Sequence, residues 1–177
     1  LKTLISKVTK KEGYTLETGV TDLIALLGDG SFRDTLGILQ KVISSSSDKK
    51  ISIKEVESIT GAPKGSLVNG YMTAIAQGKG DEALSMISKV KEENIAIKTF
   101  LALVLEKMRI VLILKNTAKG VNANDLQQHV SEDDWKVIES LAREEKNKVD
   151  SGMLRELLKA YDATSNAYIE SLPLELA

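Results

Sequence analysis

The 177-residue sequence contains no cysteine and a single histidine, and its charges nearly cancel. Without cysteine the chain can form neither a disulfide nor a thiolate metal site. The lone His129 cannot build a histidine metal cluster, and its polar surroundings, NDLQQHV, indicate a solvated histidine at a helix end. The net charge of −1 argues against a free-standing nucleic-acid-binding protein, which usually has a strongly basic face.

Enzyme signatures are also missing. The sequence has no G-x-x-x-x-G-K-S/T phosphate-binding loop, no G-x-G-x-x-G dinucleotide motif and no H-E-x-x-H zinc motif. We therefore expect no catalytic residue and no metal site, and we expect that the chain alone is not an enzyme. It begins at Leu1 instead of Met and shows no leader, which suggests a piece of a longer protein.

Long hydrophobic runs are scarce as well. The most apolar one, 100–115, is interrupted by Glu106, Lys107 and Arg109 and is shorter than the roughly 20 apolar residues that cross a bilayer. We expect it to be a buried helix and expect no membrane association.

Apolar residues recur three and four positions apart along most of the chain, which predicts an all-α fold with no strand pair. Polar residues that can cap helices precede several of these periodic segments. The expected helices span about 1–12, 16–27, 32–43, 53–59, 63–76, 81–90, 96–115, 132–142 and 151–171. The expected caps are Thr15, Ser31, Ser52 in a capping box with Glu55, Asp81 and Ser131.

Several finer expectations follow from the same periodicity. The inner face of the 32–43 helix should carry Phe32, Leu36, Leu39 and Ile43. The inner face of the last helix should carry Leu154, Leu157, Leu158 and Tyr161. Pro63 is suited to begin a helix, and the glycine-containing stretch TGAPKGS around it is the best domain boundary. The chain then divides into domains 1–61 and 62–177.

The stretch GDGSFRDTLGILQ, residues 28–40, places Arg33 in the first turn of a helix. A helix N-terminus is electrostatically positive, so a cation there is misplaced unless an anion accompanies it. Ser31 can cap this helix, and Asp34 can offset the dipole. Arg33 then either forms a surface pair with Asp29 or Asp34, or it is free to bind a phosphate oxygen together with the open helix end.

The same stretch resembles the start of the lid subdomain in bacterial DNA polymerase III subunit gamma/tau, the clamp-loader ATPase. That family's sensor-2 motif reads G-S-x-R-D-A-L-x-x-x-D-Q. Its matching positions here are Gly30, Ser31, Arg33, Asp34, Leu36 and Gln40. Thr35 replaces the usual Ala, and Leu39 stands where Asp is common. The resemblance continues less specifically through 1–27 and, downstream, to the final LPLELA.

The resemblance implies a small AAA+ lid helical bundle over 1–61 followed by a clamp-loader collar helical bundle over 62–177. In this family the lid arginine reaches the phosphates of ATP held by a preceding P-loop domain, a role that falls on Arg33 here, with Ser31 and Asp34 supporting it. The parent protein would be an ATPase subunit of a DNA polymerase holoenzyme, a nucleotidyltransferase, that uses ATP and magnesium. Its partners would be the other subunits of a hetero-pentamer, the sliding clamp and primed DNA, in the bacterial cytoplasm.

Two other functions stay open at this point. The stretch IKEVESITGAPKGSLVNGYMTAI is compatible with a helix-turn-helix, with Lys64, Ser66 and Asn69 on the recognition helix. Only Lys54 and Lys64 supply basic charge there, against Glu55 and Glu57. The chain could also be an all-α adaptor with no nucleotide role.

Overall fold

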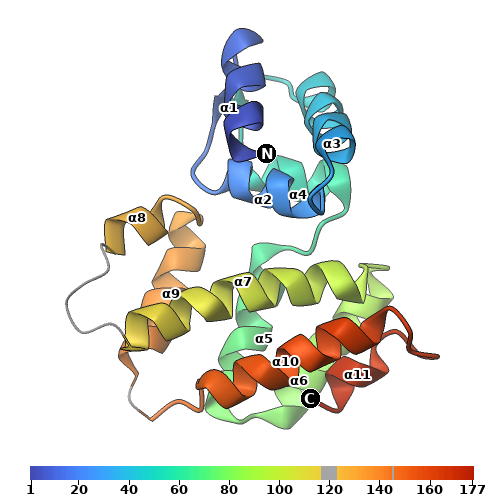
Figure 1. Cartoon of the computed structure of the whole chain (residues 1–177), viewed down its shortest axis with the longest axis vertical. Helices are drawn as coiled ribbons and strands as arrows, with labels where there is room; N and C mark the ends of the chain where they lie inside the picture. Colours follow the sequence, from blue (N-terminus) through green and yellow to red (C-terminus); the bar gives the residue numbers. More distant parts are fainter. Residues whose placement is uncertain (117–122, 145) are drawn as a thin grey trace. The chain divides into compact units, whose positions relative to one another are not determined.

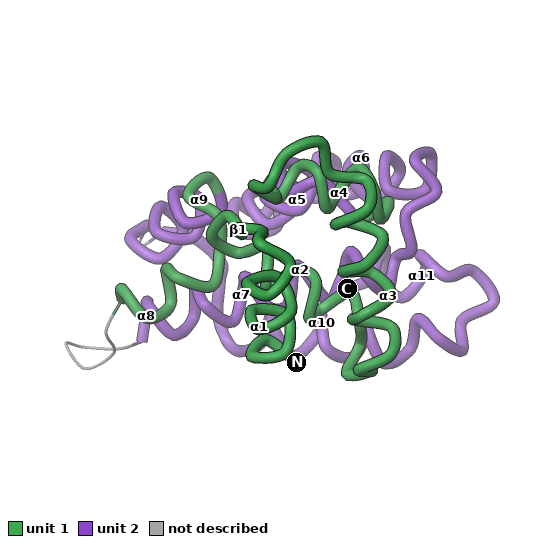
Figure 2. The backbone as a smooth tube through the Cα atoms, turned by 90° about the horizontal axis from the view of Figure 1, so that it is seen from above, with its two compact units in different colours: residues 1–62, 123–133 green, residues 63–122, 134–177 purple. Residues whose placement is uncertain are grey.

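The computed structural model describes residues 1–116, 123–144 and 146–177. They form two compact units, which Figure 2 colours separately. The first unit comprises Leu1–Ala62 together with Ala123–Asp133, and the second comprises the remainder from Pro63 onward. The predicted second domain, 62–177, includes 123–133, whereas the structure groups this segment with the first unit. That the units are a lid and a collar remains a prediction.

The first unit is built from short helices around α2 (Figure 1). α2 contacts α1, α3 and α4. The elements are α1 (Lys2–Lys11), β1 (Thr15–Leu16), α2 (Val20–Leu27), α3 (Phe32–Ser45), β2 (Lys50–Ile51), α4 (Ile53–Thr60) and α8 (Ala123–Gln127). Its most buried apolar side chains are those of Ile5, Val20, Ile24, Leu39, Val42, Ile51 and Val56.

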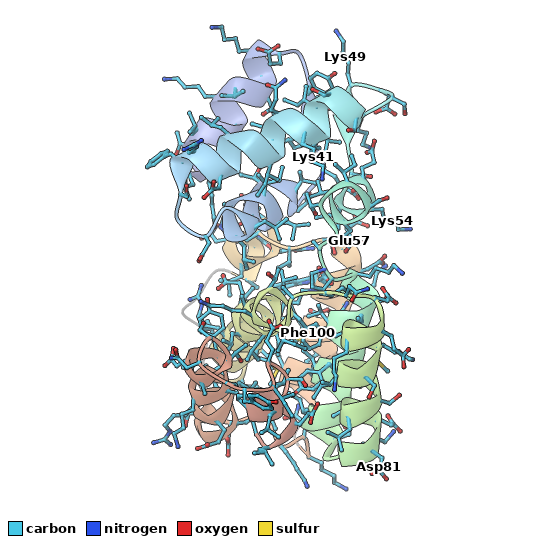
Figure 3. All side chains as sticks on the ribbon, turned by 90° about the vertical axis from the view of Figure 1, so that its right-hand side faces the viewer. Lys41, Lys49, Lys54, Glu57, Asp81 and Phe100 are labelled. Atoms are coloured by element: carbon cyan, nitrogen blue, oxygen red, sulfur yellow. The ribbon has the colours of Figure 1, made fainter. Side chains whose placement is uncertain are left out.

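The second unit packs its longest helix, α7, against α5 and α10 (Figure 1). Its elements are α5 (Gly65–Gln77), α6 (Gly80–Glu92), α7 (Ile97–Asn116), α9 (Glu132–Arg143, from Asp134 onward), α10 (Ser151–Thr164) and α11 (Leu172–Glu175). Phe100, labelled in Figure 3, is fully buried and meets the ring of Tyr71 edge-on, with 5.4 Å between the ring centroids. This geometry is favourable for two aromatic rings.

Helices dominate both units, so the all-α prediction is confirmed. The expected buried helix at 100–115 is α7, and no helix in the described ranges has the length and apolarity to span a membrane. The predicted capping box on α4 is present: Ser52 Oγ accepts from the Glu55 N–H, and Glu55 Oε2 accepts from the Ser52 N–H.

The expectation of no strand pair was wrong. β1 and β2 form a short parallel pair in which Thr15 is opposite Lys50 and Leu16 is opposite Ile51. Thr15 therefore does not cap the next helix. α2 instead begins at Val20, after Gly19, whose φ of 87° and close approach to the backbone of Ser131 exclude a side chain.

The inner face of α3 is also rotated from the predicted one. Its buried residues are Thr35, Leu39 and Val42, whereas Phe32 is 62% exposed and Leu36 is 38% exposed. The cause is tertiary: Thr35 faces Gly28, which has no side chain to hold it away.

Three boundaries also differ from the predictions. α5 begins at Gly65 with Lys64 as its N-cap, two residues after Pro63. α6 begins at Gly80 with Lys79 as its N-cap, so Asp81 lies in the first turn. α10 ends at Thr164, and its buried face carries Leu157, Ala160 and Thr164, while Leu158 is exposed.

Candidate functional site

The turn from α2 into α3 sets up the N-terminus at which Arg33 lies. Asp29 and Gly30 both have positive φ values, 44° and 80°. The N–H of Ser31 donates to the carbonyl of Gly28 at 2.8 Å and closes the turn. Asp tolerates the left-handed region better than most residues, and glycine enters it freely. The sequence GDGS therefore reverses the chain locally and delivers Ser31 to the start of α3.

Ser31 is the N-cap of α3, as the sequence predicted. Its Oγ accepts a hydrogen bond from the N–H of Asp34 at 3.2 Å, and its carbonyl accepts from the N–H of Thr35 at 3.0 Å. The carboxylate of Asp34 lies in the first turn, where a negative charge is favourable. The N–H groups of Phe32 and Arg33 have no acceptor within the helix, because no carbonyl precedes them by four helical residues.

A second contact holds this turn in place. The hydroxyl of Thr35 donates to the carbonyl of Ser31 at 2.7 Å, and the side chain of Thr35 is fully buried. A Cβ on Gly28 would lie only 2.0 Å from Oγ1 of Thr35. The bare backbone of Gly28 is therefore required for α3 to start where it does.

Arg33 occupies the second helical position and is exposed. Within the described part of the chain it forms no ion pair, so the alternative surface pairs with Asp29 and Asp34 are not made. Its guanidinium is permanently charged and carries donors in a planar fork that matches phosphate oxygens. The arrangement combines a free arginine with a helix end whose dipole favours the same anion.

His129 is half-exposed and follows α8, in the polar surroundings that the sequence indicated. Its Nδ1 lies 3.1 Å from Oδ1 of Asp22 on α2, and Lys2 pairs with the same oxygen. The contact attaches the 123–133 segment to the rest of the first unit. No group of three or more His, Asp or Glu side chains among the described residues could hold a metal ion.

The second unit contains a buried polar cluster that the sequence analysis missed. Nζ of Lys107 on α7 lies 2.5 Å from Oδ1 of Asp134 on α9 and donates to Oδ1 of Asn69 on α5 at 3.1 Å. Nδ2 of Asn69 donates to Asp134 at 2.8 Å. The only signal in the sequence was a lysine inside an apolar helix, which does not identify its partners.

This cluster bears on the helix-turn-helix alternative. Asn69 uses its amide inside the unit, and Lys64 pairs with Glu93 at 3.4 Å. Two of the three residues suggested for DNA recognition are therefore engaged within the protein. In addition, α4 and α5 belong to different compact units.

Comparison with known proteins supports the resemblance noted from the motif. The chain is 22% identical over 116 residues to DNA polymerase III subunit gamma/tau from Mycobacterium tuberculosis and from Mycobacterium bovis. The match covers 66% of this chain and 20% of each relative, so the chain spans about a fifth of their length. The resemblance to subunit gamma/tau is thereby confirmed.

No protein-family model matches the chain. Among solved structures, the Bacillus subtilis DNA clamp loader delta protein is similar over 99% of this chain and 53% of its own, with 18% sequence identity and a TM-score of 0.48.

Proposed function

We propose that this chain is the lid and collar region of a clamp-loader subunit of the gamma/tau type, acting in bacterial DNA replication. The sequence match to DNA polymerase III subunit gamma/tau and the all-α organisation support this assignment. The first unit would be the lid and the second the collar. The complete subunit would be an ATPase in the cytoplasm, within a polymerase holoenzyme that has nucleotidyltransferase activity.

Within this proposal Arg33 is the sensor of bound nucleotide. ATP and its magnesium ion would be held by a preceding P-loop domain, and the Arg33 guanidinium would bind a phosphate oxygen on the γ-phosphate side. The observation that carries the role is that Arg33 is exposed and unpaired, among the described residues, at a helix end already capped by Ser31. Asp34 would support the site by offering its N–H to that cap.

The second unit would supply subunit assembly. In the proposal its helices pack beside those of other clamp-loader subunits in a hetero-pentamer, which then handles the sliding clamp and primed DNA. Eight of the 20 residues of α7 are buried, including Phe100, Val104 and Met108, so in the proposal α7 is the core around which the assembly helices are arranged.

The test of Arg33 uses the full-length subunit that the proposal implies, assembled with its partners. Arg33→Ala should weaken ATP-dependent clamp loading and leave the fold intact, because the side chain is exposed. Lys41→Ala, an exposed cation later on the same helix, is the matched control and should load normally. Unchanged nucleotide affinity together with unchanged loading in Arg33→Ala would contradict the proposed role.

Assembly is tested separately by mixing the chain with clamp-loader subunits and measuring mass by native mass spectrometry. We expect the chain to enter a complex with them. Absence of any complex at micromolar concentration would favour an unrelated all-α adaptor. The isolated chain should not hydrolyse ATP, and measurable turnover by pure material would contradict the assignment of the P-loop to another domain.

A further inference from the structure

Four exposed lysines of the first unit lie on two segments that are distant in sequence and that the β1–β2 pair brings together. Lys10 and Lys11 lie in the last turn of α1, Lys49 directly precedes β2, and Lys50 is the first residue of β2. We call these four residues the lysine cluster. They are almost forty residues apart in sequence, so only the tertiary structure reveals their proximity.

The β1–β2 pair brings the two segments together. The N–H of Thr15 donates to the carbonyl of Lys49 at 2.7 Å, and Thr15 is opposite Lys50 in the strand pair. The turn between α1 and β1 lies close to the side chain of Lys49. A Cβ added at Gly13 would be 3.6 Å from Nζ of Lys49. Figure 3 shows Lys49 projecting from the surface of the unit.

The charge of the lysine cluster is not neutralised by ion pairs. All four side chains are exposed, and within the part of the chain that the structure describes none of them makes an ion pair. The acids beside them in sequence are Glu12 and Asp48, and Oδ1 of Asp48 accepts from the backbone N–H of Lys50 at 2.7 Å. The cluster with these two acids carries a charge of about +2, which the net charge of the whole chain conceals.

We propose that the lysine cluster binds the phosphate backbone of a nucleic acid without reading its bases. Lysines act as mobile point charges, which suits phosphate contacts that need no fixed geometry. A membrane surface fits less well, because peripheral membrane binding also needs apolar anchors. The exposed large apolar side chains of the described residues lie on other elements than α1, β1 and β2. This inference does not depend on the role of Arg33.

The test measures binding of the whole chain to a fluorescently labelled DNA duplex by anisotropy at several salt concentrations. Four phosphate contacts predict a slope of log K against log salt near −3.6, or roughly a hundredfold loss of affinity between about 50 and about 200 mM salt. Replacing Lys49 and Lys50 by Gln should reduce the slope by about 1.8. Lys10→Gln with Lys11→Gln should do the same.

The matched control is Lys79→Gln with Lys159→Gln. It removes the same charge from lysines that are paired with Glu82 and Glu156 in the second unit, and it should retain the full slope. Absence of salt-dependent binding would overturn the proposal, as would an equal loss in the control variant. Competition by polyglutamate as effective as by DNA, at equal charge concentration, would also overturn the assignment to phosphate.

Discussion

Nζ of Lys107 lies 2.5 Å from Oδ1 of Asp134, and both side chains are almost entirely buried, at 8% and 12% exposure. The pair joins α7 to α9, and Asn69 of α5 hydrogen bonds to both partners. Burying an ion pair costs the hydration free energy of both charges. Only close geometry and additional hydrogen bonds compensate for that cost. Here the amide of Asn69 supplies a donor and an acceptor at once.

Breaking this pair should be strongly destabilising. Lys107→Met removes the ammonium group that lies 2.5 Å from the buried carboxylate of Asp134, and we expect a loss of about 3–5 kcal/mol in the free energy of unfolding. The double variant Lys107→Met with Asp134→Leu should recover much of that loss, since the buried carboxylate is removed as well. Urea unfolding measures both, and a cost below about 1 kcal/mol for the single variant would contradict a buried, structurally required pair.

Gly28→Ala should destabilise the first unit by about 1–3 kcal/mol, because the added carbon would overlap the hydroxyl of Thr35. The φ of Gly28 is −75°, so the backbone itself would accept alanine. Thr35→Ala removes the nearest obstructing atom, Oγ1, although Cα and Cβ of residue 35 stay 3.0 Å from the added carbon. The double variant should therefore be more stable than the sum of the single effects predicts. Additive single effects in thermal unfolding would show that the contact is not the cause.

Gly37→Ala should stabilise the first unit, in contrast to Gly28→Ala. Gly37 lies inside α3, and no atom lies within 4 Å of the place where its Cβ would be. Alanine has the higher helix propensity, so this variant should be more stable by about 0.5–1 kcal/mol. A destabilised Gly37→Ala variant in the same thermal unfolding experiment would mean that this face of α3 is covered.

The capping box of α4 should contribute to stability in a pH-dependent way. Hydrogen bonds from the backbone N–H and then the hydroxyl of Ser52, and a weaker one from Ser46, hold the pKa of Glu55 below its ordinary value of 4.5. Because the folded-state pKa is lowered, the contribution is complete above about pH 4.5 and is lost as the pH falls through the folded-state value. Glu55→Gln should therefore lose less stability on acidification than the unmodified chain, as urea unfolding across about pH 2–6 would measure.

The matched control for that series is Glu12→Gln, which removes an exposed carboxylate from the end of α1 instead of from a capping box. It leaves the capping box of α4 intact, so a change in acid dependence that appears in Glu55→Gln and not in Glu12→Gln is assigned to the capping box. Identical acid profiles for Glu55→Gln and the unmodified chain would contradict the contribution of the capping box.

Tyr71 should make stability fall as the pH rises, whereas Glu55 makes it fall as the pH drops. Burial against Phe100 raises the pKa of Tyr71 from 10.0 to about 12. The folded state favours the neutral phenol of Tyr71. The contribution of this group to the free energy of unfolding is therefore complete below pH 10 and is lost as the pH rises toward 12. Ultraviolet absorbance should show one tyrosine ionising only near pH 12 or on unfolding, and Tyr71→Phe should remove that step. Ionisation of all four tyrosines near pH 10 would be inconsistent with this burial.

The sequence by itself determined the features that depend on one helical turn. Ser31 and Ser52 were identified as N-caps because the donor of each capping hydrogen bond lies three residues away, within a contiguous stretch. The all-α class followed from the period of the apolar residues. The resemblance that supports the proposed function was visible in the same way, as a short motif around Arg33.

Tertiary structure decided what depends on residues far apart in the chain. The burial of Thr35 instead of Leu36 follows from how closely α3 can approach Gly28. Thr15 pairs with Lys50 and is not the expected helix cap, because its backbone N–H donates to the carbonyl of Lys49 in the β1–β2 pair. Periodicity reports which residues share a face, but it does not say which neighbour that face meets. The lysine cluster and the partners of Lys107 became visible only when those neighbours were known.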